Sequence, residues 1–480
     1  MENSNKYTLV EALEKLKAGE IASVDLVKDC FEQIEIFDDE IKAFVTTRKA
    51  DALEEAEKAD ELIKKNGNKA FNDQPLLGIP YVCKDNFSTK GVETTASSNV
   101  LKGYLPPYES TVTQRLKDAG AILIGKTNLD AWSHGGSTEQ SDFFTTKNPW
   151  DVTRLPGGSS GGTGAALAAH MTIFGLGVDT GGSIRCPASW CGITGLKPTY
   201  GRVSRYGVIA MCSSTDSPGP MTKTAEDAAL ILEVISGKDS YDATSSNESV
   251  PKYADVIDDL PMAGLTIGRA TTFFTKEMDP GVVKVVNEAI DKFKELGAKV
   301  VDVDLLDPKY ALAVYTIVQR SEVSSNLARF DGIRFGHPRT EFGNEAKKRM
   351  MLGAYALSAG YYDQYYSTAQ KVRTLIRKDF DAKFEDVDVI IGPTLPSVAQ
   401  KLGASSTNPI WGELIDMLQD PASMSGIPSL AFPVGFSEDL PVGAQVMGPF
   451  FSEDKLFSVV HKFQQETDYH KKFPDLKENK

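Results

Sequence analysis

Two glycine-rich segments of this chain place serine side chains in settings suited to acyl transfer. Residues 156–162 read Pro-Gly-Gly-Ser-Ser-Gly-Gly, and residues 179–185 read Asp-Thr-Gly-Gly-Ser-Ile-Arg. Glycine loses much backbone entropy on folding and has no side chain to pack, so neither segment suits the interior of a helix or strand. Glycine pairs beside serines instead let backbone N–H groups surround a small reacting group. The pattern predicts an acyl-transfer site.

A nucleophilic serine needs a neighbouring base, and the five histidines offer few candidates. His170 follows an alanine-rich stretch, and only His134, beside two glycines, is placed to face a pocket. Lys84 is the alternative, because it directly follows the apolar run 79–83. Burial lowers the pKa of a lysine, so a desolvated amine can accept a proton near neutral pH. A lysine at a strand end usually extends to water, but the serine segments favour a catalytic role.

Two other patterns in the sequence do not support the sites that they resemble. Residues 120–127 match a P-loop string, but the four middle residues, Ala-Ile-Leu-Ile, are expected to form the strand itself, so no nucleotide site is predicted. The five cysteines are scattered, without the paired spacings of a zinc site or a disulfide framework. We expect buried, reduced thiols, no bound metal and no cofactor in this chain.

Composition limits the classes of partner. The chain has 480 residues and a formal net charge of −14, which argues against binding nucleic acid by itself. Its first residues lack the apolar core of a signal peptide, and no apolar run reaches the ~18 residues of a membrane helix. These features predict a cytoplasmic protein without membrane contact.

The elements that must position the serines follow from hydrophobic periodicity. Residues 1–66 are predicted to be helical, with a capping box of Thr8 and Glu11 at the first helix. Beyond them, buried strands and helices alternate, which indicates a sheet covered by helices on both faces. The predicted strands are 78–83, 121–124, 172–178, 265–267, 300–303 and 387–391, and the predicted helices between them are 111–119, 225–235, 280–296 and 371–384. Residues 240–249 are expected to form an exposed loop.

Taken together, the motifs resemble the amidase signature family. The resemblance rests on the segments 157–162 and 179–188 and on Lys84 within Val-Cys-Lys-Asp-Asn. It implies an α/β amidase signature fold with a large mixed central sheet. The expected organisation is one domain over 1–480, with a helical segment at 1–66 and a catalytic core at 67–470.

The resemblance also implies a role for each reacting residue. Ser183 would be the nucleophile, Ser159 a bridging serine preceded by a cis peptide bond, and Lys84 the base and proton donor. The oxyanion hole would be formed by the backbone N–H groups of Thr180, Gly181, Gly182 and Ser183. An acyl-enzyme would then form with release of ammonia.

Further segments resemble one branch of the family, the A subunits of the amidotransferases that act on glutamyl-tRNA(Gln) or aspartyl-tRNA(Asn). These segments are 147–151, 195–207 and 324–332, whereas 132–137 and 336–345 depart from that pattern. The branch implies a glutamine amidohydrolase with B and C subunits as partners. ATP and Mg²⁺ would bind on the partner, and tRNA would be contacted only through it.

The same branch implies a glutamine-binding trio of Tyr315, Arg349 and Asp416. A guanidinium pairs with an α-carboxylate and a carboxylate with an α-ammonium. Asp420 replaces Asp416 if the alignment is shifted. The alternative function is a stand-alone amidase acting on small aliphatic or aromatic amides, and a catalytically silent assembly protein is the third, disfavoured by intact Lys84, Ser159 and Ser183.

Overall fold

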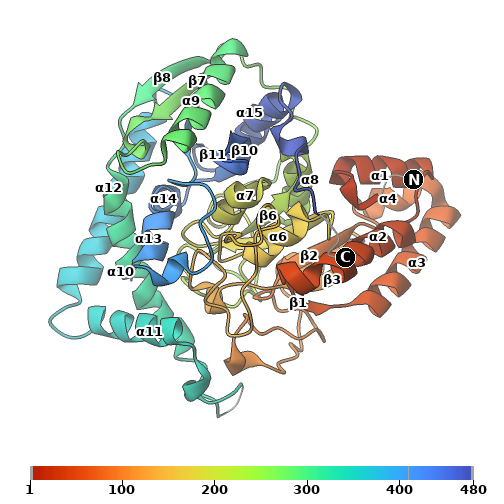
Figure 1. Cartoon of the computed structure of the whole chain (residues 1–480), viewed down its shortest axis with the longest axis horizontal. Helices are drawn as coiled ribbons and strands as arrows, with labels where there is room; N and C mark the ends of the chain where they lie inside the picture. The colour runs from red at the N-terminus through yellow and green to blue at the C-terminus, as the bar shows by residue number, and fades with distance from the viewer. Residues whose placement is uncertain (1–3, 334–335, 409, 477–480) are drawn as a thin grey trace.

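The computed structural model describes residues 4–333, 336–408 and 410–476 (Figure 1). Its centre is a mixed sheet in which the described residues form eleven strands, in the order β1-β3-β2-β4-β6-β5-β10-β11-β9-β7-β8. The strands are β1 (Phe44–Thr47), β2 (Pro80–Lys84), β3 (Ile122–Thr127), β4 (Phe174–Asp179), β5 (Thr194–Lys197), β6 (Ser217–Thr222), β7 (Thr266–Ala270), β8 (Lys299–Val303), β9 (Val389–Pro393), β10 (Ser429–Ser437) and β11 (Leu440–Met447). Strand β2 is parallel to β3 and β4, and β7 is parallel to β8 and β9, whereas the remaining neighbours are antiparallel.

The helices gather in groups around this sheet. They are α1 (Leu9–Ala18), α2 (Ser23–Ile41), α3 (Lys49–Asn66), α4 (Ala70–Asp73), α5 (Thr111–Asp118), α6 (Gly161–Ala168), α7 (Arg185–Cys191), α8 (Ala225–Ile235), α9 (Pro280–Glu295), α10 (Pro308–Leu327), α11 (Asn344–Ala356), α12 (Thr368–Lys383), α13 (Trp411–Asp416), α14 (Asp420–Ser425) and α15 (Glu453–Gln465). Figure 1 shows α1 to α4 together beside β1, β2 and β3, and α10 to α14 together on the other side of the molecule. No helix in these ranges is long and apolar enough to cross a membrane.

Neighbouring residues of β10 show that helices cover both faces of the sheet, because successive side chains of a strand point in opposite directions. Ala431 packs in a cluster with Ile184 and Ala188 at helix α7. The ring of Phe432 instead lies 5.4 Å from that of Phe463 of α15. The predicted α/β class with a mixed sheet and an N-terminal helical segment is therefore confirmed.

The local sequence predictions can be compared with individual elements. All six predicted strands form, and the P-loop-like string is strand β3, as expected from its apolar residues. The capping box at α1 is present, with the Glu11 N–H donating to the Thr8 hydroxyl at 3.1 Å. Five strands were not predicted: β1, β5, β6, β10 and β11.

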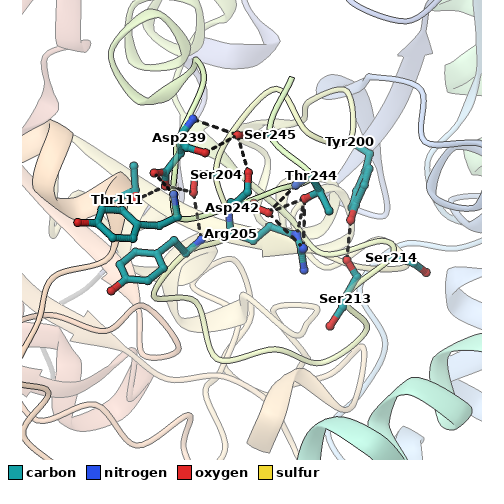
Figure 2. A network of polar contacts seen from close by, with 12 residues as sticks. Thr111, Tyr200, Ser204, Arg205, Ser213, Ser214, Asp239, Asp242, Thr244 and Ser245 are labelled. Atoms are coloured by element: carbon teal, nitrogen blue, oxygen red, sulfur yellow. Dashed lines mark hydrogen bonds and ion pairs between the residues drawn. The ribbon is translucent and has the colours of Figure 1, made fainter. Parts of the chain in front are cut away.

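The loop between α8 and β7 is more strongly anchored than its polar sequence predicts (Figure 2). Residues 240–249 lie outside helices and strands, but they are not simply exposed. The Asp239 carboxylate accepts hydrogen bonds from the hydroxyls of Thr111 and Ser204. The buried Asp242 carboxylate accepts the backbone N–H of Arg205 at 2.8 Å. These two aspartates fix both the loop and the segment that precedes β6.

Candidate active site

Strand β4 delivers the second glycine-rich segment to the centre of the molecule. All six residues of β4 are buried, and Asp179 ends the strand. Residues 180–183, named the serine loop here, connect it to helix α7, and the side chain of Ser183 at its end is largely buried, with the residue 5% exposed. The sequence places the serine at this point because Thr180 and two glycines, Gly181 and Gly182, follow a buried strand.

Arg185 anchors Asp179, the residue that directly precedes the serine loop. Its guanidinium forms a bidentate pair with Asp179, with two contacts of 3.0 Å, and both side chains are fully buried. It also donates to the Gln445 side-chain oxygen at 3.0 Å and to the Ser423 hydroxyl at 2.8 Å. Burial alone would raise the pKa of the Asp179 carboxyl, but Arg185 keeps it below its usual value. The loop is thereby tied to β11 and α14.

Lys84 meets Ser159 at the end of β2. The Lys84 Nζ donates to Ser159 Oγ at 2.6 Å and to the Val178 carbonyl at 3.4 Å. Lys84 is fully buried, and burial lowers the pKa of its amine to about 7, although the carboxylates of Asp130 and Asp216 act in the opposite direction. A substantial fraction of the amine is therefore neutral near pH 7.

The two serine segments lie against each other. The Ser160 N–H donates to the Ser183 carbonyl at 3.1 Å. The peptide bond between Gly158 and Ser159 is cis, as the family resemblance implies. The structure thus brings the predicted residues Lys84, Ser159 and Ser183 into one buried region.

Asp216 fixes the first residue of the serine loop and was not predicted from the sequence. Its carboxylate accepts the Thr180 hydroxyl at 2.8 Å and the Met211 N–H at 2.9 Å. Burial raises the pKa of this carboxyl to about 6. Asp216 immediately precedes a strand with two prolines, and no local pattern marks it as part of the site.

Asp130 is a second residue that was not predicted from the sequence. Its buried carboxylate accepts the backbone N–H groups of Thr138 at 2.9 Å and Gln140 at 3.0 Å. A Cβ at Gly135 or Gly158 would collide with this carboxylate. Asp130 therefore holds the backbone of residues 137–140, at the end of the segment 132–137 that differs from the A-subunit pattern, close to the glycine that precedes Ser159. Gly135 and Gly158, which lie beside its carboxylate, were the sequence signal that could have indicated Asp130.

The predicted trio lines one small cavity although its members come from three separate helices. Tyr315 lies on α10, Arg349 on α11 and Asp416 on α13. The cavity has a volume of about 10 Å³, close to the least that can hold one water. Its other lining residues are Gly135, Gln319, Arg320, Gly412 and Glu413.

Charges around this cavity are paired or buried. Arg349 Nε donates to the Glu345 carboxylate at 2.7 Å, and Arg320 forms an ion pair with Glu413. Burial raises the pKa of the Asp416 carboxyl well above its usual value, and the charge of Asp179 adds to this effect. Asp420, the alternative to Asp416, is fully buried at the start of α14 and is not among the residues that line the cavity.

One residue that lines the cavity, Tyr315, packs on the serine loop, and Gln419 packs beside it. A Cβ at Gly181 would lie 2.5 Å from Cζ of Tyr315, and a Cβ at Gly182 would lie 2.5 Å from Oε1 of Gln419. Gly182 also has φ of +142°, a conformation that side chains other than glycine rarely adopt. Gly181 is thus required by close packing, and Gly182 by both close packing and its backbone conformation.

The remaining histidine and cysteine candidates have no hydrogen bond to Lys84, Ser159 or Ser183 among the described residues, although His134 adjoins Gly135 of the cavity. His134 is fully buried, and burial lowers its pKa well below the usual value. The His170 ring packs 4.2 Å from that of Phe473. All five cysteines are buried and unpaired, and the part of the chain that the structure describes contains no group of His, Cys, Asp and Glu side chains able to hold a metal ion.

Comparisons with known proteins identify the family of the chain. The sequence model of the amidase family matches residues 25–457. The chain is 46% identical to the A subunit of the glutamyl-tRNA(Gln) amidotransferase of Carboxydothermus hydrogenoformans, over 97% of this chain and 98% of that protein. It is 45% identical to the protein of the same name from Methylococcus capsulatus, over 98% and 99%.

Solved structures extend the comparison to the fold. The protein of that same name from Thermotoga maritima superimposes with a TM-score of 0.84 at 36% identity, covering 100% of this chain and 99% of that one. A peptide amidase from Stenotrophomonas maltophilia superimposes with a TM-score of 0.80 at 27% identity, covering 96% of both. The fold is therefore common to a peptide amidase and to the A subunit of an amidotransferase.

Proposed function

The chain belongs to the amidase family, and from that premise we propose that it is the glutamine amidohydrolase subunit of a tRNA-dependent amidotransferase. One observation carries the proposal. Tyr315, which lines the cavity with Arg349 and Asp416, packs directly on Gly181 of the serine loop. An amino acid bound by the trio would then present its side-chain amide to Ser183.

The reacting residues act in sequence. Neutral Lys84 draws a proton from Ser159, which takes one from the Ser183 hydroxyl, and Ser183 Oγ attacks the carboxamide carbon. Backbone N–H groups of the serine loop stabilise the oxyanion, and each such donor contributes about 3 kcal/mol. The proton returns from Lys84 through Ser159 to the departing nitrogen, so ammonia leaves and a γ-glutamyl ester remains on Ser183. Water then hydrolyses the ester by the reverse proton path and releases glutamate.

The trio selects the donor by charge. The Arg349 guanidinium, oriented by Glu345, pairs with the α-carboxylate, and the Asp416 carboxylate pairs with the α-ammonium. The cavity of about 10 Å³ is smaller than an amino acid. Entry of glutamine therefore requires movement of a wall, and α13, which carries Asp416 and is held to α10 by the Arg320–Glu413 ion pair, is the short element that can supply it.

Partners complete the activity. The similar proteins are named as amidotransferase subunits, so this chain passes ammonia to B and C subunits. ATP and Mg²⁺ bind on a partner. The net charge of −14 is consistent with a chain that contacts tRNA only through that partner. The acyl-transfer chemistry described above uses side chains and backbone N–H groups of this chain and needs no cofactor within it.

A stand-alone amidase is the second candidate, because the Stenotrophomonas peptide amidase shares the fold. The purified chain should be assayed for ammonia release from L-glutamine, L-asparagine, propionamide and benzamide, with Ser183→Ala as the blank. Glutamine-selective release supports the amidotransferase role. Turnover of the simple amides with glutamine ignored would instead establish the stand-alone amidase.

A further inference from the structure

The cavity beside the serine loop contains a buried carboxamide that no described residue satisfies. Gln319 on α10 is 1% exposed and lines this cavity. Neither its Oε1 nor its Nε2 has a hydrogen-bond partner among the described residues. Buried amide groups are nearly always hydrogen-bonded, and leaving one unpaired costs free energy. The side chain is therefore better explained by a ligand than by folding.

The position of Gln319 identifies which part of a ligand it meets. Gln319 follows Tyr315 by four residues on α10, so the two side chains lie on the same helix face. Tyr315 contacts Gly181 at the reacting end of the site. Four residues of helix span about 6 Å, so Gln319 is displaced by one turn from the reacting end. Arg349 and Asp416 line the same cavity.

The chemistry of the group fits a zwitterion. A carboxamide donates through two N–H groups and accepts through its oxygen. The α-carbon of an amino acid carries one acceptor, the carboxylate, and one donor, the ammonium. The neighbouring Arg320 is already paired with Glu413, and the neighbouring Arg349 with Glu345. Gln319 is thus the uncharged cavity side chain whose donors and acceptor are both unused within the described chain.

We propose that Gln319 is a specificity-determining residue that hydrogen-bonds the α-carboxylate and α-ammonium end of the amide donor. Gln319 therefore favours an amino-acid amide over an amide that lacks the α-carboxylate and the α-ammonium. The inference rests on the proposed glutamine amidohydrolase function and adds a fourth residue to the donor site. Gln419, which is also buried and unpartnered, differs because its carboxamide packs on Gly182 and does not line the cavity.

The test compares Gln319→Leu and Gln319→Glu with the parent in the full-length chain. Glutamate keeps the shape of the side chain but replaces its N–H donors with a carboxylate, which repels the α-carboxylate of the donor. Both variants should raise the KM for L-glutamine about tenfold or more, as expected for loss of hydrogen bonds to charged groups, with kcat changed less than about twofold. The kcat/KM for butyramide, which is glutamine without its α-substituents, should stay the same wherever it is measurable.

Thermal unfolding separates this role from a structural one. Because the polar atoms of Gln319 have no partner among the described residues, Gln319→Leu should not lower the Tm. Gln33→Leu is the matched control, since Gln33 on α2 also has a buried, unpartnered side-chain oxygen but lines a different groove, and its KM should equal that of the parent. An unchanged KM in Gln319→Leu overturns this inference alone. A parent chain that releases ammonia only from simple amides overturns the proposed function as well.

Discussion

The phenol ring of Tyr315 lies directly on the backbone of Gly181. A Cβ built on Gly181 would be 2.5 Å from Cζ and 2.7 Å from the hydroxyl oxygen of Tyr315. Tyr315 belongs to α10 and Gly181 to the loop after β4, so elements separated by more than a hundred residues form one wall. This contact makes the cavity and the serine loop parts of a single site.

Gly181→Ala should therefore reduce catalysis more than the addition of a single methyl group would suggest. The added methyl group displaces either Tyr315 or the loop, and displacements of about 1 Å in a catalytic site can cost about 100-fold in rate. We expect a loss of that order in kcat/KM for ammonia release from glutamine. Gly412→Ala is the control, because Gly412 lines the same cavity but a Cβ there meets nothing within 4 Å. Equal activity of Gly181→Ala and the parent would contradict the contact.

The pH dependence of the reaction should report Lys84. Its amine must be neutral to accept a proton, and burial lowers its pKa to about 7. Below that pH the ammonium form dominates, so kcat/KM should fall about tenfold per pH unit. The measurement is a profile of kcat/KM from pH 5 to 9. Because the Asp216 carboxylate raises the pKa of Lys84, Asp216→Asn should keep a single fall in kcat/KM but move it to lower pH. A profile flat down to about pH 5 would remove Lys84 as the base.

Lys84 should also affect stability. Its amine has a pKa of about 7 in the folded state and about 10.5 when exposed. Between these values the unfolded chain binds more protons, so the free energy of unfolding should rise with pH. Lys84→Met should lose activity while the increase in unfolding free energy from pH 7 to 9 becomes smaller, as measured by urea denaturation. The same pH slope in parent and variant would show that the amine is not desolvated.

Removing Arg185 should destabilise the whole protein. Arg185→Gln leaves the carboxylate of Asp179 buried without its bidentate partner, and breaking such a pair costs about 3–5 kcal/mol. Arg269→Gln provides the contrast, since Arg269 pairs with the largely exposed Asp302 and such surface pairs contribute about 0–1 kcal/mol. Urea denaturation measures both. Similar losses in the two variants would show that Arg185 does not anchor the loop.

Strands with a local sequence signal could be predicted, whereas a strand that forms because of its tertiary contacts could not. Buried apolar runs such as 172–178 marked strands, because few other elements combine that length with that composition. Strand β6 was missed since its sequence, Ser-Pro-Gly-Pro-Met-Thr, has two prolines and a glycine, which disfavour strands. It forms because β4 and β5 pair with it on either side.

The residues of the site also divide into those with a signal in the sequence and those without one. Glycine patterns indicated the two serine segments, the apolar run before Lys84 indicated a buried base, and family resemblance suggested the trio. Asp130 and Asp216 were not predicted, because their importance lies in backbone N–H groups and hydroxyls that only the fold brings to their carboxylates. Gln319 was not predicted either, since a glutamine inside a helix has no distinctive pattern until its burial and missing partners are known.

The central claim is that Ser183 is acylated by glutamine. The full-length chain should be mixed with L-glutamine, quenched with acid during turnover, and digested for peptide mapping by mass spectrometry. The account predicts a γ-glutamyl ester on Ser183, released by hydroxylamine and missing from Ser183→Ala. Ammonia release from glutamine with the acyl group on another residue, or undiminished release by Ser183→Ala, would contradict it.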